Sequence, residues 1–405
     1  MGEPVENALV VRAKPARRIF KANKITKVPQ SLLDDPKLKA AIDNLPKNYN
    51  FEIPKILWRI KETNSKTVAL QMPEGLLLYA TTIADIIEDF SDAETIIMGD
   101  VTYGACCIDD LTAKSLGVDL MVHFGHSCLV TVDQTKGIKV LYIFVDIKID
   151  PLHFLETIKY NFPKTTKLGL VSTIQFLTTL QAVANKLKEF EYEVILPQSK
   201  PLSAGEILGC TAPALKCTDA VIYLGDGRFH LEAIMIANPK IQAYKYDPYK
   251  KEFTREYYEY DKMVSIRRKN IDKSSNSKNF GVIMGTLGRQ GNINVVEHTR
   301  KSLEDKDKRV AVILLSEIFP KKLELFPQLD TFVQIACPRL SIDWGESFSK
   351  PLLTPYELTV AIGNMQWHHE NKYPMDFYAS SSLGPWTPNH KPGVDESKSC
   401  CGKCA

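Results

Sequence analysis

Apolar runs alternate with amphipathic stretches along most of the chain. The runs "TVALQMPEG", "KLGLVSTIQ" and "NFGVIMGTLG" have apolar centres, which is typical of strands that are covered on both faces. The stretches "LLLYATTIADIIEDF", "TLQAVANKLKEFEY" and "NVVEHTRKSLED" carry apolar residues near helical spacing. A capping box with proline at the first helical position, "TPYE" (354–357), opens a further helix. The pattern predicts an α/β fold built on parallel sheets.

The alternation occurs three times. After the runs above come the strand-like segments "ETIIMGD", "YEVILPQ" and "RVAVILLS", and then "VDLMVHFG", "TDAVIYLG" and "LDTFVQIA". Each member of the last set has an aspartate followed six positions later by a small residue: Asp119 and Gly125, Asp219 and Gly225, Asp330 and Ala336. A repeat of roughly 100–110 residues is too long for a solenoid. We therefore predict three small parallel-sheet α/β domains related by pseudo-threefold symmetry.

The domain boundaries follow from where the periodicity starts and stops. A basic arm that includes "RRIFKANKI" precedes the first strong pattern, and the far end is rich in proline, serine and glycine, which is typical of disorder. The predicted division is a basic N-terminal arm over 1–50, α/β domains over 51–150, 151–270 and 271–385, and a flexible tail over 386–405.

Composition narrows the class of protein. The chain has 405 residues, of which 44% are hydrophobic and 24% charged, as in soluble globular proteins. The charge balance of 51 basic to 48 acidic residues is too even to indicate direct nucleic-acid binding. No apolar run is long enough for a membrane helix, and the N-terminus has no signal-peptide h-region. We expect a cytoplasmic protein with no membrane partner.

Three of the nine cysteines stand at strand ends, one in each third of the chain. These are Cys106, Cys210 and Cys337. Because ligands bind at the carboxyl edges of parallel sheets, threefold symmetry would bring the three thiols to one point. The alternative for a free cysteine is a small buried hydrophobic residue, and we assign that role to Cys107, Cys128 and Cys217. The cysteines of the tail, Cys400, Cys401 and Cys404, form no complete zinc motif and are expected to be loose thiols.

Three thiolates without a fourth suit a metal centre that keeps one coordination site open. Zinc with three cysteines and a water molecule fits this description, and so does a [4Fe-4S] cluster with one iron free to bind substrate. The chain has no H-E-x-x-H motif and no C-x₃-C-x₂-C loop. Both kinds of centre therefore remain open on the residues alone.

The stretches around these cysteines resemble the diphthamide-biosynthesis radical enzymes of eukaryotes, in their cluster-carrying subunit. The likeness rests on "GDVTYGACCIDD", "GEILGCTAP", "IACPRLSIDWG" and "MGTLGRQG", and it runs from about residue 50 to 390. It implies that Cys106, Cys210 and Cys337 hold a [4Fe-4S] cluster and that S-adenosylmethionine is the substrate. The implied reaction transfers a 3-amino-3-carboxypropyl group to C2 of a histidine in translation elongation factor 2 and releases methylthioadenosine. The implied partners are a related subunit 2 and a small iron-binding electron donor.

Contacts to the rest of the cofactor are predicted in "MGTLGRQGN" (284–292). This segment follows a strand and contains Gly285, Gly288, Arg289 and Gln290, which offer backbone N–H groups and a guanidinium that could clamp a carboxylate. The alternative is a tight turn whose arginine faces solvent. In the same way, His230 either approaches the site or caps a helix, and Asp343 and Trp344 either shape the pocket or pack.

Other functions remain open at this stage. A quinolinate-synthase-like dehydratase or condensing enzyme would also hold an open-iron cluster with one cysteine from each of three units. A non-catalytic scaffold subunit of the same complex and a structural zinc protein are further alternatives. Formation of methylthioadenosine distinguishes the first of these rivals from the transferase, and metal analysis distinguishes the last.

Overall fold

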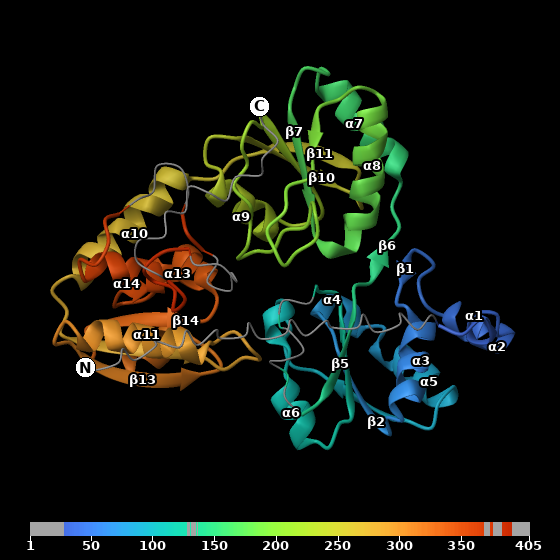
Figure 1. Cartoon of the computed structure of the whole chain (residues 1–405), viewed down its shortest axis with the longest axis horizontal. Coiled ribbons are helices and arrows are strands. Elements are labelled where there is room, and N and C mark those ends of the chain that lie inside the picture. The colour runs from blue at the N-terminus through green and yellow to red at the C-terminus, as the bar shows by residue number, and fades with distance from the viewer. Residues whose placement is uncertain are drawn as a thin grey trace, which may run out of the picture.

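Each third of the chain folds onto its own sheet, which gives three lobes (Figure 1). The computed structural model describes residues 28–127, 130, 135, 137–367, 373–375 and 383–390. The basic arm up to residue 27, Cys128 and the three cysteines of the tail lie outside the described residues.

The first lobe, drawn in blue and teal in Figure 1, carries a sheet with strand order β3-β2-β4-β5. Its elements are α1 (Gln30–Leu33), α2 (Pro36–Ile42), β1 (Tyr49–Asn50), α3 (Ile53–Thr63), β2 (Thr67–Gln71), α4 (Glu74–Leu77), α5 (Ala80–Asp89), β3 (Glu94–Met98), η1 (Ala105–Cys107), α6 (Asp110–Ser115), β4 (Leu120–Phe124), β5 (Lys139–Ile143) and β6 (Asp146–Ile147).

The second lobe, drawn in green, has strand order β8-β7-β9-β10-β11. Its elements are α7 (Pro151–Asn161), β7 (Leu168–Ser172), η2 (Ile174–Phe176), α8 (Leu177–Glu189), β8 (Val194–Ile195), β9 (Ala220–Leu224), α9 (Phe229–Ala237), β10 (Gln242–Asp247) and β11 (Glu252–Glu256). Only β11 runs antiparallel to its neighbour in this sheet.

The third lobe, drawn in yellow to red, has strand order β13-β12-β14-β15. Its elements are α10 (Tyr260–Ser274), β12 (Asn279–Gly285), α11 (Ile293–Glu304), β13 (Arg309–Leu315), α12 (Pro320–Glu324), β14 (Thr331–Ile335), α13 (Pro338–Trp344), η3 (Gly345–Ser347), β15 (Leu352–Leu353) and α14 (Pro355–Ala361). The predicted capping box at Thr354 and Glu357 is present at the start of α14.

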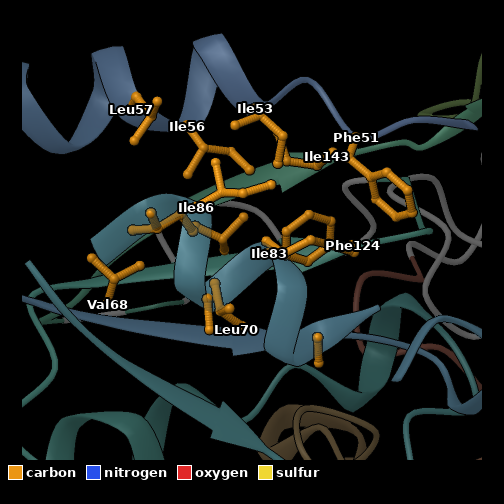
Figure 2. Close-up of a cluster of buried hydrophobic side chains, with 14 of the residues drawn as sticks. Phe51, Ile53, Ile56, Leu57, Val68, Leu70, Ile83, Ile86, Phe124 and Ile143 are labelled. Atoms are coloured by element: carbon orange, nitrogen blue, oxygen red, sulfur yellow. The ribbon is translucent and has the colours of Figure 1, made fainter. Parts of the chain in front are cut away.

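The three sheets share one order of parallel strands. Counting only the parallel strands of each sheet in chain order, the first lies between the second and the third, and the fourth follows the third, while β1 and β6 form a separate two-stranded pair. Buried apolar side chains cover both faces of each sheet. Figure 2 shows one such core, where α3 and α5 pack on strands β2, β4 and β5. The α/β fold with parallel sheets is confirmed, while the threefold axis and the domain boundaries stay predictions.

The repeated aspartate joins two strands at the edge of each sheet where the parallel strands begin. The carboxylate of Asp119 accepts from the backbone N–H groups of Lys66 and Thr67, at 2.7 and 3.2 Å, just where β2 begins. Asp219 accepts in the same way from the backbone of Lys167 before β7, at 2.9 Å. Each aspartate thus ties the start of the third strand of its sheet to the start of the first.

The third lobe makes the fullest version of this contact. Asp330 accepts from the backbone of Lys278 and Asn279, at 3.0 and 2.8 Å, and from the Asn279 side chain at 3.2 Å. These N–H groups hold the pKa of Asp330 below its usual range. The sequence repeat therefore has a local structural cause.

Segments at both ends of the predicted body belong to the lobes. Residues 28–50, assigned to the arm, contain α1, α2 and β1, and they bury Leu38 and Leu45 in the core of the first lobe. At the other end, Trp386, assigned to the tail, is 6% exposed and its ring packs on Tyr356 at 5.0 Å. Leu38, Leu45 and Trp386 are large apolar side chains that are buried, although the sequence around them is mostly polar.

A buried ion pair supports the helix that follows Cys337. Arg267 of α10 is fully buried and donates to both carboxylate oxygens of Glu357, each at 2.6 Å. The same guanidinium donates to the carbonyl of Ser341 in α13, at 2.7 Å. Burying a charge is tolerated only with such complete pairing, so α13 is held by a rigid anchor.

Within the described residues, no helix combines the length and the apolar character that crossing a bilayer requires.

Replacing the repeated aspartates tests their role. We expect Asp330→Ala to lower the free energy of unfolding by about 1 kcal/mol, because exposed charge-assisted hydrogen bonds to backbone are lost. Asp119→Ala and Asp219→Ala should cost less, in that order, since they accept fewer N–H groups. Urea denaturation measures the three values. Asp89→Ala, at an exposed helix end without a backbone contact, serves as the control, and an equal loss in it would contradict the assignment.

Candidate functional site

The three strand-end cysteines come from three lobes. Cys106 lies in η1 after β3, Cys210 lies in the segment between β8 and β9, and Cys337 directly precedes α13. All three are half-buried, whereas the neighbouring Cys107 is 1% exposed. Cys217 was expected to be buried, and this prediction is wrong. It is exposed, in a left-handed turn with φ of 54° ahead of β9.

Electrostatic interactions connect these thiols across the lobes. The pKa of Cys106 is raised well above the ordinary thiol value by its hydrogen bond to Cys107, by burial and by the charges of Cys107, Cys210 and Cys337. Burial also raises the pKa of Cys337. Thiolates that disfavour one another in a desolvated site need a cation to compensate their charge. The donor set therefore fits a thiolate-bound metal centre.

The arrangement differs from that of a single-ion site. Among the described residues, no group of three or more His, Cys, Asp or Glu side chains is placed to hold one metal ion. A zinc ion would draw its three thiolates to about 2.3 Å from one point, whereas a cubane cluster separates them more widely. Among the described residues, the thiols are thus not gathered around one point as a single zinc ion would require.

The side chains of Cys107 and Cys106 are hydrogen-bonded to each other. The hydrogen bond from Cys106 lowers the pKa of Cys107 to about 7, against the effect of burial. The Gln290 side-chain amide also donates to the Cys107 sulfur, at 3.7 Å. Cys107 is therefore a hydrogen-bonded neighbour in addition to a packed one.

Arg339 ties the third lobe to the loop that carries Cys210. It stands two residues after Cys337, is 2% exposed and donates to the carbonyl oxygens of Phe229 and Gly209, at 2.7 and 3.4 Å. Its other N–H groups pair with Glu232 at 2.6 Å and Asp343 at 2.9 Å. Asp343 thus has a positioning role in this clamp, whereas Trp344 is 63% exposed.

Gly209 shows how tightly this loop is packed. A Cβ at this position would lie 1.9 Å from the Phe229 ring, so no side chain fits beside Cys210. The Arg339 guanidinium in turn covers the same ring at 4.4 Å.

A second clamp joins the third lobe to the turn of Cys106. The Arg289 backbone donates to the Cys106 carbonyl at 2.7 Å, and its guanidinium binds both carboxylate oxygens of Asp110 at 2.8 and 2.6 Å. Gly288 has φ of 55°, and a Cβ there would lie 2.4 Å from the Cys107 backbone. The segment "MGTLGRQG" therefore packs on the cysteine turn. Cofactor binding by Gly285, Gly288, Arg289 and Gln290 stays a prediction, with Arg289 already paired.

A cavity of about 440 Å³ lies between the first and second lobes. Its lining includes Pro73, Gly125, His126, Leu208, Asp226 and His230, and contains no lysine or arginine. Beside it, the hydroxyl of Ser127 donates to the buried carboxylate of Glu206. This volume and the mixture of apolar walls with a few polar groups are typical of a small-molecule site.

The histidines of this region are held neutral. Burial lowers the pKa of His123 to about 3 and that of His126 and His230 to about 4. His123 contacts Gln71 and His126 through its two ring nitrogens, at 2.9 and 3.2 Å. His230 is among the residues that the sequence suggests for the site, whereas His123 and His126 are not, because a histidine inside or just after an apolar strand has the pattern of a core residue.

Comparison with known proteins gives consistent results. The diphthamide synthesis protein family matches residues 72–374. The 2-(3-amino-3-carboxypropyl)histidine synthase subunit 1 of Gallus gallus is 59% identical over 364 residues, which are 90% of this chain and 88% of that protein. The protein of the same name in Homo sapiens is 57% identical over 365 residues, with 90% and 83% covered.

A solved structure shares the fold. Dph2 from Pyrococcus horikoshii, determined with a 4Fe-4S cluster, aligns with a TM-score of 0.67 and 25% identity. The alignment covers 80% of this chain and 94% of that one. The likeness thus extends far beyond a single lobe.

Arg339→Met tests the clamp on the Cys210 loop. We expect amide hydrogen exchange across 208–211 to become about tenfold faster, because hydrogen bonds to a buried cation are lost. The matched control is Arg228→Met, since Arg228 also pairs with Glu232 but is 48% exposed. Equal exchange in the two variants would show that Arg339 does not hold this loop.

The buried histidine His123 predicts a dependence of stability on pH. Its pKa is lowered in the folded chain, so below pH 6.5 the unfolded chain takes up a proton that the native state rejects. The free energy of unfolding should therefore fall by about 2 kcal/mol per such histidine between pH 6.5 and 5. His123→Gln should reduce this slope in urea titrations, and His153→Gln, at an exposed position, should not. An unchanged slope in the first variant contradicts the prediction.

Proposed function

Since the chain belongs to the diphthamide synthesis protein family, we propose that it is the cluster-carrying subunit of a 3-amino-3-carboxypropyl transferase. The donor is S-adenosylmethionine, the acceptor is C2 of a histidine in translation elongation factor 2, and methylthioadenosine is the second product. The observation that best supports the proposal is that Cys106, Cys210 and Cys337 come from three different lobes and are each half-buried, and that the charges of Cys210 and Cys337 help to raise the pKa of Cys106. The names of the relatives and the likeness to Dph2 support it.

Three thiols of this chain would hold the cluster. Cys106, Cys210 and Cys337 would each bind one iron as thiolates, and the fourth iron would be open to the sulfonium substrate. When bound, the cluster supplies the electron that cleaves the bond between the sulfonium sulfur and Cγ of the methionine moiety.

The residues of the chain bind and orient the reactants. Arg289 and Arg339 fix the loops of Cys106 and Cys210 against the third lobe, so the three thiols keep one geometry while substrate enters. The cavity between the first two lobes offers a carboxylate, Asp226, and no cationic side chain. That charge suits S-adenosylmethionine, whose net charge is positive.

The proposal includes partners and a location. We infer a related subunit 2 as heterodimer partner and a small iron-binding protein as electron donor. The elongation factor is the protein substrate, so we place the complex in the cytoplasm. The nine cysteines of the chain fit such a reducing compartment.

Separate alanine variants of the two adjacent cysteines test the proposal. The full-length chain is purified without oxygen together with subunit 2, and iron, sulfide, visible absorption and methylthioadenosine are measured. Cys106→Ala should lose the cluster absorption and all methylthioadenosine. Cys107→Ala should keep most of both and lose about 1 kcal/mol of stability, as expected for trimming a small buried side chain.

The remaining cysteines complete this test. Cys210→Ala and Cys337→Ala should behave like Cys106→Ala, and Cys217→Ala like the wild type. A cluster retained in Cys106→Ala but lost in Cys107→Ala would show that the ligand is the other thiol. A cluster without methylthioadenosine in the wild type would contradict the proposed reaction.

A further inference from the structure

A row of three side chains leads from the cysteine turn to the cavity between the first and second lobes. Gln71 at the end of β2 contacts the backbone beside Cys107. His123 of β4 contacts Gln71, and His126, just beyond β4, contacts His123. Gln71 and His123 are 2% and 0% exposed, whereas His126 lines the cavity.

The orientation of the Gln71 amide is determined by backbone groups. Its Nε2 donates to the Cys107 carbonyl at 3.0 Å, and its Oε1 accepts from the Asp109 N–H at 3.4 Å. A carbonyl can only accept and an N–H can only donate, so oxygen and nitrogen of the amide cannot be exchanged. The atom that faces His123 Nδ1 at 2.9 Å is therefore the oxygen, and His123 Nδ1 must carry the proton.

This proton assignment propagates to the next ring. A neutral imidazole has one donor and one acceptor nitrogen, and burial keeps both rings neutral at pH 7, with the pKa of His123 lowered to about 3 and that of His126 to about 4. With its proton on Nδ1, His123 can only accept at Nε2. The contact of 3.2 Å to His126 then favours a proton on His126 Nδ1, and the His126 ring also interacts with the backbone of Phe124. The Nε2 of His126 is left without a proton.

The cavity around His126 favours a cation. Its lining has no lysine or arginine, and its ionisable members are Asp226, Tyr49, Tyr249 and the two histidines. His230, from α9 of the second lobe, faces the same cavity and its pKa is also lowered by burial. A small ligand that carries an ammonium group would meet acceptors here and no lysine or arginine in the lining, while Arg339, whose charge also acts on His230, is paired with Glu232 and Asp343.

We propose that Gln71 and His123 hold His126 as the Nδ1–H tautomer, so that its bare Nε2 accepts a hydrogen bond from the ammonium group of a small cationic ligand in this cavity. Identifying the ligand as S-adenosylmethionine rests on the proposed function. His126 is then a binding residue, and Gln71 and His123 are positioning residues that connect it to the turn of Cys106.

Nuclear magnetic resonance of the full-length chain labelled with nitrogen-15 histidine measures the tautomer directly. His126 should have its proton on Nδ1. In Gln71→Met the amide oxygen that accepts from His123 Nδ1 is replaced by a weakly accepting thioether. His123 and His126 should then both move toward the Nε2–H form. The control is Gln175→Met, which removes a glutamine that lines the cavity but does not contact His123, and it should leave both tautomers unchanged. A proton on His126 Nε2 in the wild type overturns the proposal.

Ligand binding tests the second half of the proposal. Calorimetry of the cluster-loaded full-length chain compares S-adenosylhomocysteine, which has the ammonium group, with methylthioadenosine, which lacks it. His126→Leu should weaken S-adenosylhomocysteine about tenfold and leave methylthioadenosine within about twofold, and His126→Gln should restore part of the loss through its amide oxygen.

The other outcomes each decide the question. Equal weakening of both ligands would mean that His126 only shapes the cavity. If both ligands bind unchanged but transfer to the elongation factor is slower, His126 Nε2 accepts its hydrogen bond from the imidazole of the protein substrate and not from the small ligand. Either result overturns the proposal. Failure of both adenosyl compounds to bind the wild type would contradict the proposed function and the identity of the ligand. The tautomer of His126 would still test whether Gln71 and His123 orient its ring.

Discussion

Arginine contacts that cross between lobes hold the loops of Cys106 and Cys210 against the third lobe. Each lobe folds around its own sheet and its own core, and nothing in that separate folding places one sheet edge relative to another. Arg339 and Arg289 provide directional contacts to the loops of Cys210 and Cys106, respectively. A planar cation with several donors in a rigid fork fixes orientation as well as distance. The third lobe therefore serves as the frame on which the site is assembled.

Removal of the cysteine thiols from water changes their pKa values and favours binding of a cation. Burial and the charges of the other thiols raise the pKa of Cys106, and burial raises that of Cys337, so a cation would compensate their thiolate forms. On the other side of the Cys106 turn, Gln71 and two neutral histidines extend the same desolvated region to a cavity without cationic side chains. The proposed cluster site and the proposed ligand site are thus connected through the turn of Cys106.

The sequence predicts local features well and distant contacts poorly. The strands, the long helices and the capping box at Thr354 follow from periodicity and caps, and the structure contains them. Asp110 is separated from Arg289 by 179 positions, and no local pattern connects the two. The buried pair of Arg267 and Glu357 and the row from Gln71 to His126 are missed for the same reason. Cys217 was misjudged because burial is a property of the fold, not of the residue type.

The central claim is that one cysteine from each lobe binds the same cluster. A crystal structure of the anaerobically purified complex, with data collected at the iron absorption edge, tests it most directly. If the three cysteines bind one cluster, each copy of this chain has one compact anomalous peak, bonded to the sulfurs of Cys106, Cys210 and Cys337. Iron bound to Cys107, or bound by cysteines from fewer than three lobes, would contradict it.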